Sequence, residues 1–164
     1  MDAQNSAPTQ ITSQQLYHYA LSLLARRDHS RTELQQKITR RFGAEARELL
    51  LGTLDRLEAE HYQSDLRFAQ LYINSRLQRG FGLNRIKLEL QQKGISKALF
   101  APLVLDSTVK EHEQQQLERI WRKKFNAPPS NSKERYQQQA HLINKGFRRE
   151  LIELFFCGIN QDTD

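Results

Sequence analysis

The chain has 164 residues, and its 25 lysines and arginines outnumber 19 aspartates and glutamates, so the formal net charge is +6 at pH 7. Only 38% of the residues are hydrophobic, and adding the seven glycines leaves this share below the roughly 45–50% of an ordinary globular domain. Eight phenylalanines, five tyrosines and one tryptophan are too many aromatic residues for a disordered chain. We therefore expect an elongated fold with a thin core.

The composition also excludes several classes of protein. No apolar run approaches the ~20 residues of a membrane span, and the N-terminal segment has neither the basic start nor the apolar stretch of a signal peptide. The only cysteine, Cys157, cannot form an internal disulfide or supply a thiolate zinc site by itself, and its apolar surroundings predict a packed thiol. These features predict a cytoplasmic protein with no membrane partner.

Helical periodicity dominates from residue 13 onward, and no stretch shows a persuasive strand alternation. In chain order, the expected helices span about 13–27, 30–43, 45–60, 64–78, 83–94, 96–105, 108–125 and 132–146, with a last helix that ends near 157. The predicted fold class is therefore all-α.

Start and stop signals support these boundaries. Ser30-Arg-Thr-Glu33 and Thr108-Val-Lys-Glu111 are capping boxes, in which a hydroxyl and a carboxylate satisfy free amides of the first helical turn. Ser64 and Ser96 are expected N-caps. Pro102 is expected to kink or shorten the helix that ends near 105.

Apolar residues at helical spacing predict the buried face of each helix. The fourth helix has such a broad apolar arc that we expect it to be covered on two sides. The expected inward residues of the first three helices are Leu16, Ala20, Leu23, Leu24, Leu34, Ile38, Phe42, Leu50, Leu54 and Leu57. Those of the last two are Tyr136, Ala140, Ile143, Phe147, Leu151, Leu154 and Phe155.

An internal repeat is the most informative feature. Glu33-Leu-Gln-Gln-Lys37 recurs letter for letter as Glu89-Leu-Gln-Gln-Lys93. Leu90-Gln-Gln-Lys-Gly-Ile95 is in turn similar to Leu142-Ile-Asn-Lys-Gly-Phe147. Each segment is the second helix of a three-helix set, and a period near ~50 residues is typical of repeat proteins. We therefore predict tandem helix-turn-helix-like repeats in an elongated, curved, solenoid-like molecule.

The predicted parts of the chain are a disordered tail (1–12), three three-helix repeats (13–62, 63–106 and 107–158) and a C-terminal tail (159–164).

The net charge lies almost entirely in the middle of the chain. Residues 61–105 carry seven basic and two acidic side chains, whereas residues 1–60 are neutral and residues 106–164 have a net charge of +1. A localised positive field favours a phosphate backbone or an acidic protein groove as the partner. The alternative is a solvated helix face.

No constellation of catalytic residues is present in the sequence. The five histidines are scattered without an i, i+4 metal-binding pair, and there is neither a P-loop nor a glycine-rich nucleotide motif after a strand. His29 fits a turn residue better than a general base. We therefore predict no enzyme activity, no metal site and no cofactor.

Three non-enzymatic functions remain open at this point. The helices on either side of Lys93-Gly-Ile-Ser96 look like a helix-turn-helix for sequence-specific DNA binding, but the second of them, 97–105, has few side chains that can read base edges. A non-specific DNA binder would instead align the central cations along phosphates, with Tyr72 and Phe81 available to stack bases. The third function is regulation of a partner protein.

Three segments of the chain carry a family likeness. They are Ala25-Arg-Arg-Asp-His-Ser30 with Glu33-Leu34, Asp65-Leu-Arg-Phe-Ala69 with residues 76–80, and Gly82-Leu-Asn-Arg-Ile86 with Glu89-Leu90 and Lys93-Gly-Ile95. These segments resemble the RecX proteins, which regulate the bacterial recombinase RecA. One departure is His61-Tyr-Gln-Ser64, where the family usually has glycine and an aliphatic residue before the acidic position.

The resemblance implies a regulator that lies in the groove of the RecA–DNA filament and spans neighbouring protomers. Such a protein would hinder ATP hydrolysis and strand exchange, and it would need no cofactor beyond the ATP of its partner. DNA, single- or double-stranded, would be a non-specific second partner. A monomer is the default expectation.

The candidate contact residues are basic. The first group is Arg76, Arg79, Arg85 and Lys87, and the second is Arg26, Arg27, Lys93, Arg122, Lys123 and Lys124. The alternative for each is an exposed charge that only solubilises its helix. Arg85 also has a candidate ion-pair partner at i, i+4 in Glu89.

Overall fold

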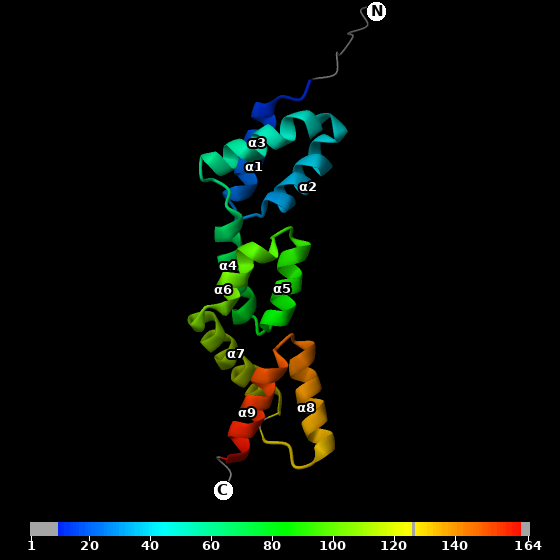
Figure 1. The fold of residues 1–164 in the computed structure, drawn as a ribbon. Helices are drawn as coiled ribbons and strands as arrows, with labels where there is room; N and C mark the ends of the chain where they lie inside the picture. Colours follow the sequence, from blue (N-terminus) through cyan, green and yellow to red (C-terminus); the bar gives the residue numbers. More distant parts are fainter. Residues whose placement is uncertain (1–9, 126, 162–164) are drawn as a thin grey trace, which may run out of the picture. The chain divides into compact units, whose positions relative to one another are not determined.

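The structure, a computed structural model, describes residues 10–125 and 127–161, and within these residues every regular element is helical (Figure 1). The predicted all-α fold is therefore confirmed. The elements are α1 (Ser13–Leu24), α2 (Arg31–Phe42), a short 3-10 helix η1 (Ala44–Ala46), α3 (Arg47–Ala59), α4 (Asp65–Gln78), α5 (Leu83–Gln92), α6 (Lys97–Leu105), α7 (Ser107–Phe125), α8 (Ser132–Asn144) and α9 (Arg149–Gln161).

Two of the predicted segments lie partly outside the described residues. Most of the tail predicted at 1–12 falls there, as do residues 162–164 of the one predicted at 159–164. The rest of the second segment is helical, because α9 continues to Gln161. None of the described helices is long and apolar enough to cross a membrane. The boundaries of the three repeats stay a prediction.

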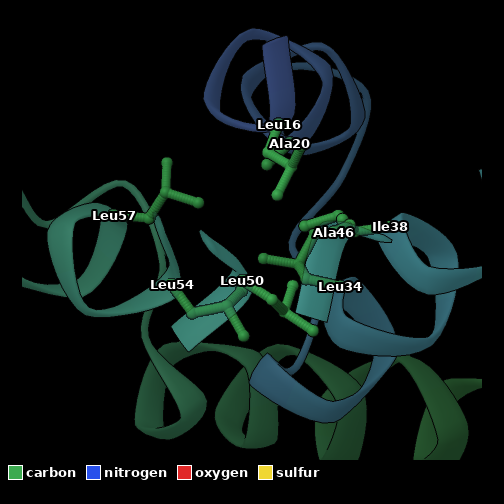
Figure 2. Packing of buried hydrophobic residues seen from close by; sticks show 8 residues of the cluster. All are labelled: Leu16, Ala20, Leu34, Ile38, Ala46, Leu50, Leu54 and Leu57. Atoms are coloured by element: carbon green, nitrogen blue, oxygen red, sulfur yellow. The ribbon is translucent and has the colours of Figure 1, made fainter. Parts of the chain in front are cut away.

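The chain passes from one compact unit to another within α4, with the first unit ending at Phe68 and the second starting at Ala69. The core of the first unit lies between α1, α2, η1 and α3, and Figure 2 shows side chains of these elements gathered around it. Burying each leucine contributes about 1.5–3 kcal/mol, which holds the three helices together. The core residues are Leu16, Ala20, Leu34, Ile38, Ala46, Leu50, Leu54 and Leu57.

The predicted inward face of the first three helices is thus largely confirmed. The three other residues expected there, Leu23, Leu24 and Phe42, are half-buried and pack against the edge of the core.

Helix α4 is fully buried along one of the two stripes expected for it. Ala69, Ile73 and Leu77 are buried, whereas Leu71 and Ser75 are exposed. Of the second expected stripe, Phe68 is buried and Tyr72 is half-buried, so the expectation that α4 is covered on two sides is confirmed only in part. The fully buried stripe recurs every four residues, which is the spacing of one helix face.

The expected inward faces of α8 and α9 are also partly wrong. Tyr136 is 73% exposed, Ile143 39% and Leu154 70%. The core around α7 to α9 consists instead of Leu117, Trp121, Leu142, Phe147, Leu151, Ile152 and Phe156.

A buried polar pair explains which face of α8 is buried. The indole Nε1 of Trp121 donates a hydrogen bond to Oε1 of Gln138 at 2.7 Å, and Gln138 is buried with it. A buried indole N–H needs an acceptor, so the polar Gln138 faces inward and Tyr136 faces outward. On α9, Cys157 is exposed rather than packed, which corrects the expectation for its thiol.

The expected serine caps are confirmed. The backbone amide of Glu33 donates to Oγ of Ser30 at 3.1 Å. The amide of Arg67 donates to Ser64 at 3.2 Å, and α6 begins after Ser96 in the same way. Pro102 lies inside α6, which nevertheless reaches Leu105.

The second predicted capping box is wrong. Helix α7 begins at Ser107, and the amide of Thr108 donates to Oδ1 of Asp106 at 2.8 Å. Hydrogen bonds from Thr108 to its carboxylate lower the pKa of Asp106, which stays ionised at the helix N-terminus. Thr108 therefore lies one residue inside the helix, because the preceding aspartate is the better cap.

The matching Lys-Gly segments at the ends of α5 and α8 have the same backbone geometry. Gly94 and Gly146 have φ angles of +80° and +90°. Beyond each glycine, the amide of Ile95 or Phe147 donates to the carbonyl five residues earlier, at 3.0 and 3.2 Å. Both apolar side chains are buried. This is the arrangement of a Schellman motif, in which glycine avoids the strain of a left-handed residue.

His61 occupies the same kind of position without being glycine. Its φ angle is +61°, and its amide donates to the carbonyl of Glu58 at 3.0 Å after the end of α3. The departure noted at His61-Tyr-Gln-Ser64 therefore places a side chain where the backbone is left-handed. For residues other than glycine, this conformation costs roughly 1–2 kcal/mol.

We expect His61→Gly to raise the free energy of unfolding by about 1 kcal/mol, because glycine removes this strain. Urea unfolding followed by far-ultraviolet circular dichroism measures the change. His18→Gly is the matched control, since His18 is exposed in the right-handed interior of α1, and it should destabilise by about 0.5–1 kcal/mol. A loss of stability in His61→Gly would show that the imidazole contributes more than the strain costs.

Candidate partner-binding surface

Glu89 joins three side chains of α4 and α5 in the second unit. Its carboxylate accepts two hydrogen bonds from Arg76, from Nε at 2.7 Å and from Nη2 at 2.6 Å. Nε of Arg85 donates at 2.9 Å, which confirms the expected i, i+4 pair, and the hydroxyl of Tyr72 donates at 2.9 Å. Two of the four first-group candidates therefore share one carboxylate.

These contacts keep Glu89 ionised. Burial raises the pKa of Glu89, but the hydrogen bonds from Arg76, Arg85 and Tyr72 outweigh burial, so the pKa lies below its usual value. The negative charge neutralises one of the two guanidinium charges. Arg76 and Arg85 are consequently part of the fold as well as candidates for partner contact.

Cations surround the ring of Phe81, in the turn between α4 and α5. The guanidinium carbons of Arg76 and Arg85 lie 3.9 and 4.3 Å from the ring centroid, and Nζ of Lys145 lies 5.4 Å from it. These are cation–π distances. Nearby, Nζ of Lys93 lies 5.2 Å from the ring centroid of Tyr72. We call this group the Phe81 cluster, and it consists of Tyr72, Arg76, Phe81, Arg85, Glu89, Lys93 and Lys145.

Lys145 is a member that sequence reasoning missed. It lies 52 positions after Lys93, in the second of the two aligned Lys-Gly segments. That alignment is the signal that could have found it.

Two glycines bring Lys145 to the cluster. The amide of Gly82 donates to the Lys145 carbonyl at 2.9 Å, and that of Asn84 donates to the Gly146 carbonyl at 3.0 Å. A Cβ on Gly82 would lie 2.2 Å from the backbone nitrogen of Phe147, and one on Gly146 would lie 2.4 Å from Cβ of Arg85. The turn between α8 and α9 therefore lies backbone to backbone against the start of α5.

This close approach leaves α5 without a side-chain cap of its own, because its N-cap residue is Gly82. A carboxylate from α7 takes that role. Glu113 is fully buried, and its Oε1 accepts the amide of Leu83 at 2.7 Å. Its Oε2 accepts a hydrogen bond from Nε of Arg148 at 2.8 Å. Glu113 thus satisfies a helix N-terminus and an arginine at once.

The other two first-group candidates lie outside the cluster. Arg79 is exposed at the end of α4, and Lys87 is half-buried on α5. Within residues 10–125 and 127–161, neither of them forms an ion pair. Their charges are therefore fully available to a partner.

The second-group candidates are dispersed. Arg26 is exposed in the first unit, where Arg27 pairs with Glu33 at 3.1 Å. Near the end of α7, Arg122 pairs with Glu118 at 2.6 Å, and Lys123 is exposed. The structure brings only Lys93 of this group into the Phe81 cluster.

Lys124 lies beside a histidine. Its Nζ is 3.1 Å from Nδ1 of His141 and 5.5 Å from the ring centroid of Phe125. Burial, followed by the charges of Lys124 and Lys145, lowers the pKa of His141. At neutral pH His141 is therefore uncharged, and its ring nitrogen can accept a hydrogen bond from the lysine ammonium.

The described part of the chain shows no group of three His, Cys, Asp or Glu side chains arranged to hold a metal ion. What the second unit displays is a rigidly built cationic surface on a bundle of short helices. The fold and these contacts together define an all-α protein of short helices with a cationic surface in its second unit.

Comparison with known proteins leads to the same class. Residues 64–101 match the family model described as RecX, second three-helix domain, and residues 111–156 match RecX, third three-helix domain. The regulatory protein RecX of Pseudomonas fluorescens (strain SBW25) is 37% identical over 147 residues, which cover 87% of this chain and 90% of that protein. The chain belongs to the RecX family of regulatory proteins, and the predicted family is confirmed.

A second relative and a solved structure support the same family and the same fold. Regulatory protein RecX of Haemophilus influenzae (strain KW20) is 33% identical over 137 residues, which cover 82% of this chain and 88% of that protein. The crystal structure of RecX from Lactobacillus salivarius has the same fold, with a TM-score of 0.79, 18% identity and coverage of 91% of this chain and 97% of that one. The family is one of regulatory proteins, in agreement with the prediction that the chain is not an enzyme.

Proposed function

We propose that this protein binds the filament that a RecA recombinase forms on DNA and lowers its ATPase and strand-exchange activity. The observation that carries the proposal is membership of the RecX family over most of the chain. In this proposal the helical repeats lie in the filament groove and span neighbouring protomers. The motions that ATP hydrolysis requires are thereby hindered, and the protein acts in the cytoplasm as a monomer.

The proposed contact residues are the basic residues already described. The Phe81 cluster supports this role, because the positive charges of Arg76, Arg85 and Lys145 outnumber the one negative charge of Glu89. Such a surface attracts acidic partners over about one Debye length. The proposed set is Arg76, Arg79, Arg85, Lys87, Arg26, Arg27, Lys93, Arg122, Lys123 and Lys124.

The DNA-dependent ATPase of a RecA-type recombinase tests the proposal. It is measured with and without this protein, alongside direct DNA binding at two salt concentrations. Inhibition at substoichiometric protein, with weak and salt-sensitive DNA binding, is the expected result. Tight DNA binding without an effect on the recombinase would instead favour the alternative function, non-specific DNA binding through the basic middle repeat.

We expect the double variant Arg79→Glu, Lys87→Glu to weaken inhibition of the recombinase by about tenfold or more. Reversing two uncompensated charges removes attraction at each site and adds repulsion, and each 1.4 kcal/mol is about a factor of ten. Arg76 and Arg85 stay unchanged in this test because they hold Glu89. The half-inhibitory protein concentration in the ATPase assay measures the effect.

Arg41→Glu is the control, since Arg41 is exposed in the last turn of α2 and belongs to neither candidate group. It should leave inhibition within about twofold of the parent protein, as a surface change away from a binding site usually does. Equal inhibition by the double variant would remove Arg79 and Lys87 from the contact surface.

A further inference from the structure

The Phe81 cluster already holds a carboxylate in the way that a protein holds an acidic ligand. Two guanidinium groups and a phenol hydroxyl converge on Glu89, with distances of 2.6–2.9 Å. The side chain of Arg76 is 15% exposed and is fixed, whereas that of Arg85 is 45% exposed and has room to turn. One of the two arginines can therefore exchange its carboxylate without moving the backbone.

The aromatic rings of the cluster are covered by cations and are therefore poorly placed to stack on nucleic-acid bases. Arg76, Arg85 and Lys145 lie over Phe81, and Lys93 lies over Tyr72, whose hydroxyl is bound to Glu89. Single-stranded nucleic acid is held largely by stacking on exposed aromatic faces. The geometry therefore favours carboxylates over nucleotides.

We propose that the Phe81 cluster is a docking site for the carboxylate side chains of an acidic protein surface, and that Glu89 is an internal competitor for it. The partner's carboxylate binds Arg85 together with Lys145, which lie over the same Phe81 ring. Glu89 limits the affinity, because it neutralises one guanidinium and repels the incoming negative charge. This inference rests on the proposed function and identifies the chemistry of the surface that Arg76, Arg85 and Lys93 would use.

The test compares Glu89→Gln with Glu153→Gln, which removes an exposed carboxylate from its pair with Arg135, a residue in neither candidate group. Glutamine keeps the shape and one acceptor oxygen at position 89 but loses the charge. The probes are a fluorescein-labelled decaglutamate peptide and a labelled decathymidylate, and fluorescence anisotropy measures their affinities at two salt concentrations. We expect Glu89→Gln to bind the peptide about three- to fivefold more tightly, which corresponds to removing one repulsion at ~4–5 Å in water. Glu153→Gln should change the affinity by less than about twofold, because such exposed charges are screened.

A second variant keeps the test decisive if Glu89→Gln does not fold. Lys145→Gln removes a cation that does not hold Glu89, and it should weaken peptide binding about threefold. Unchanged or weaker peptide binding by folded Glu89→Gln, or unchanged binding by Lys145→Gln, would overturn the proposal. Tighter binding of decathymidylate alone would overturn the choice of partner and assign the site to nucleic acid.

The recombinase assay separates this inference from the proposed function. Inhibition without peptide binding would leave the proposed function standing and refute the carboxylate site. Peptide binding that strengthens in Glu89→Gln, without any inhibition of a recombinase, would support the site and refute the proposed partner.

Discussion

Gly82→Ala is expected to lower the free energy of unfolding of the second unit by about 3 kcal/mol. The new Cβ would lie 2.2 Å from the backbone nitrogen of Phe147 and 2.3 Å from the carbonyl carbon of Gly146. A backbone segment cannot avoid the clash by a rotamer change, as a flexible side chain can. The whole turn between α8 and α9 must therefore shift. Overpacking of this kind costs about 1–3 kcal/mol, and the backbone hydrogen bonds of Gly82 and Asn84 add about 1 kcal/mol each when lost.

Urea unfolding followed by the fluorescence of Trp121 measures this effect, because Trp121 is the only tryptophan of the chain and is buried in the second unit. Gly52→Ala is the matched control. Gly52 lies inside α3 with nothing within 4 Å of its added Cβ, so alanine there should stabilise the first unit by about 0.5–1 kcal/mol. A Gly82→Ala protein that unfolds at the parent's urea concentration would show that this backbone contact does not hold the second unit together.

Glu113→Ala is expected to cost a similar amount, about 3 kcal/mol. The carboxylate is fully buried, and its loss would leave the amide of Leu83 and the guanidinium of Arg148 without their acceptor. Removing one member of a buried charged pair costs about 3–5 kcal/mol, and the lower end applies because Arg148 is partly exposed to water. The same Trp121 unfolding curve measures the change.

Two comparisons sharpen this prediction. Glu113→Gln should lose less than Glu113→Ala, because an amide oxygen can still accept from Leu83. Glu118→Ala should stay within about 0.5 kcal/mol of the parent, since Glu118 pairs with Arg122 in water. Equal losses for Glu113→Ala and Glu118→Ala would contradict the role of Glu113 as the cap of α5.

In both units, a carboxylate from a later helix caps the N-terminus of an earlier helix. In the first, Oδ1 of Asp65 accepts the amide of Arg31, the first residue of α2, at 2.8 Å. In the second, Glu113 does the same for Leu83, the first residue of α5. Asp65 begins α4 and Glu113 lies inside α7, so the two carboxylates occupy different places in their helices. An alignment of the repeats does not reveal the shared role.

Local signals predicted much of the fold correctly. Ser30, Ser64 and Ser96 cap helices because a hydroxyl three residues from a free amide acts within one turn. The Lys-Gly ends of α5 and α8 follow from the freedom of glycine at positive φ. These effects depend on a few neighbouring residues, and the sequence displays them directly.

The errors arose where a choice depended on distant residues. Tyr136 is more apolar than Gln138, so the periodicity of apolar residues predicted the wrong buried face for α8. The indole of Trp121, on another helix, decides that Gln138 faces inward. Thr108 and Asp106 are both acceptable caps, and the observed helix start selects Asp106.

For the candidate surface too, the sequence predicted some features and only the structure revealed the others. Charge counting located the excess of cations in residues 61–105, and the sequence named Arg76 and Arg85 as candidate contact residues, with Glu89 as a partner for Arg85 only. The structure places both on Glu89 and adds Lys145 from a later repeat. Charge is a property of composition, but whether a charge is free depends on which carboxylates the fold brings within ~4 Å.

The sequence by itself determined the helical class and the positions of most helices, because propensity, capping and spacing act over a few residues, and its motifs carried the resemblance to the family. Only the tertiary structure decided which arginines are engaged, which faces are buried and how the turn around Gly146 meets Gly82. Those features depend on contacts across 13 to 63 positions of the chain, such as Arg76 to Glu89, Leu83 to Glu113 and Gly82 to Lys145. Spacing along the chain does not encode such pairs, since they form only when the helices have packed.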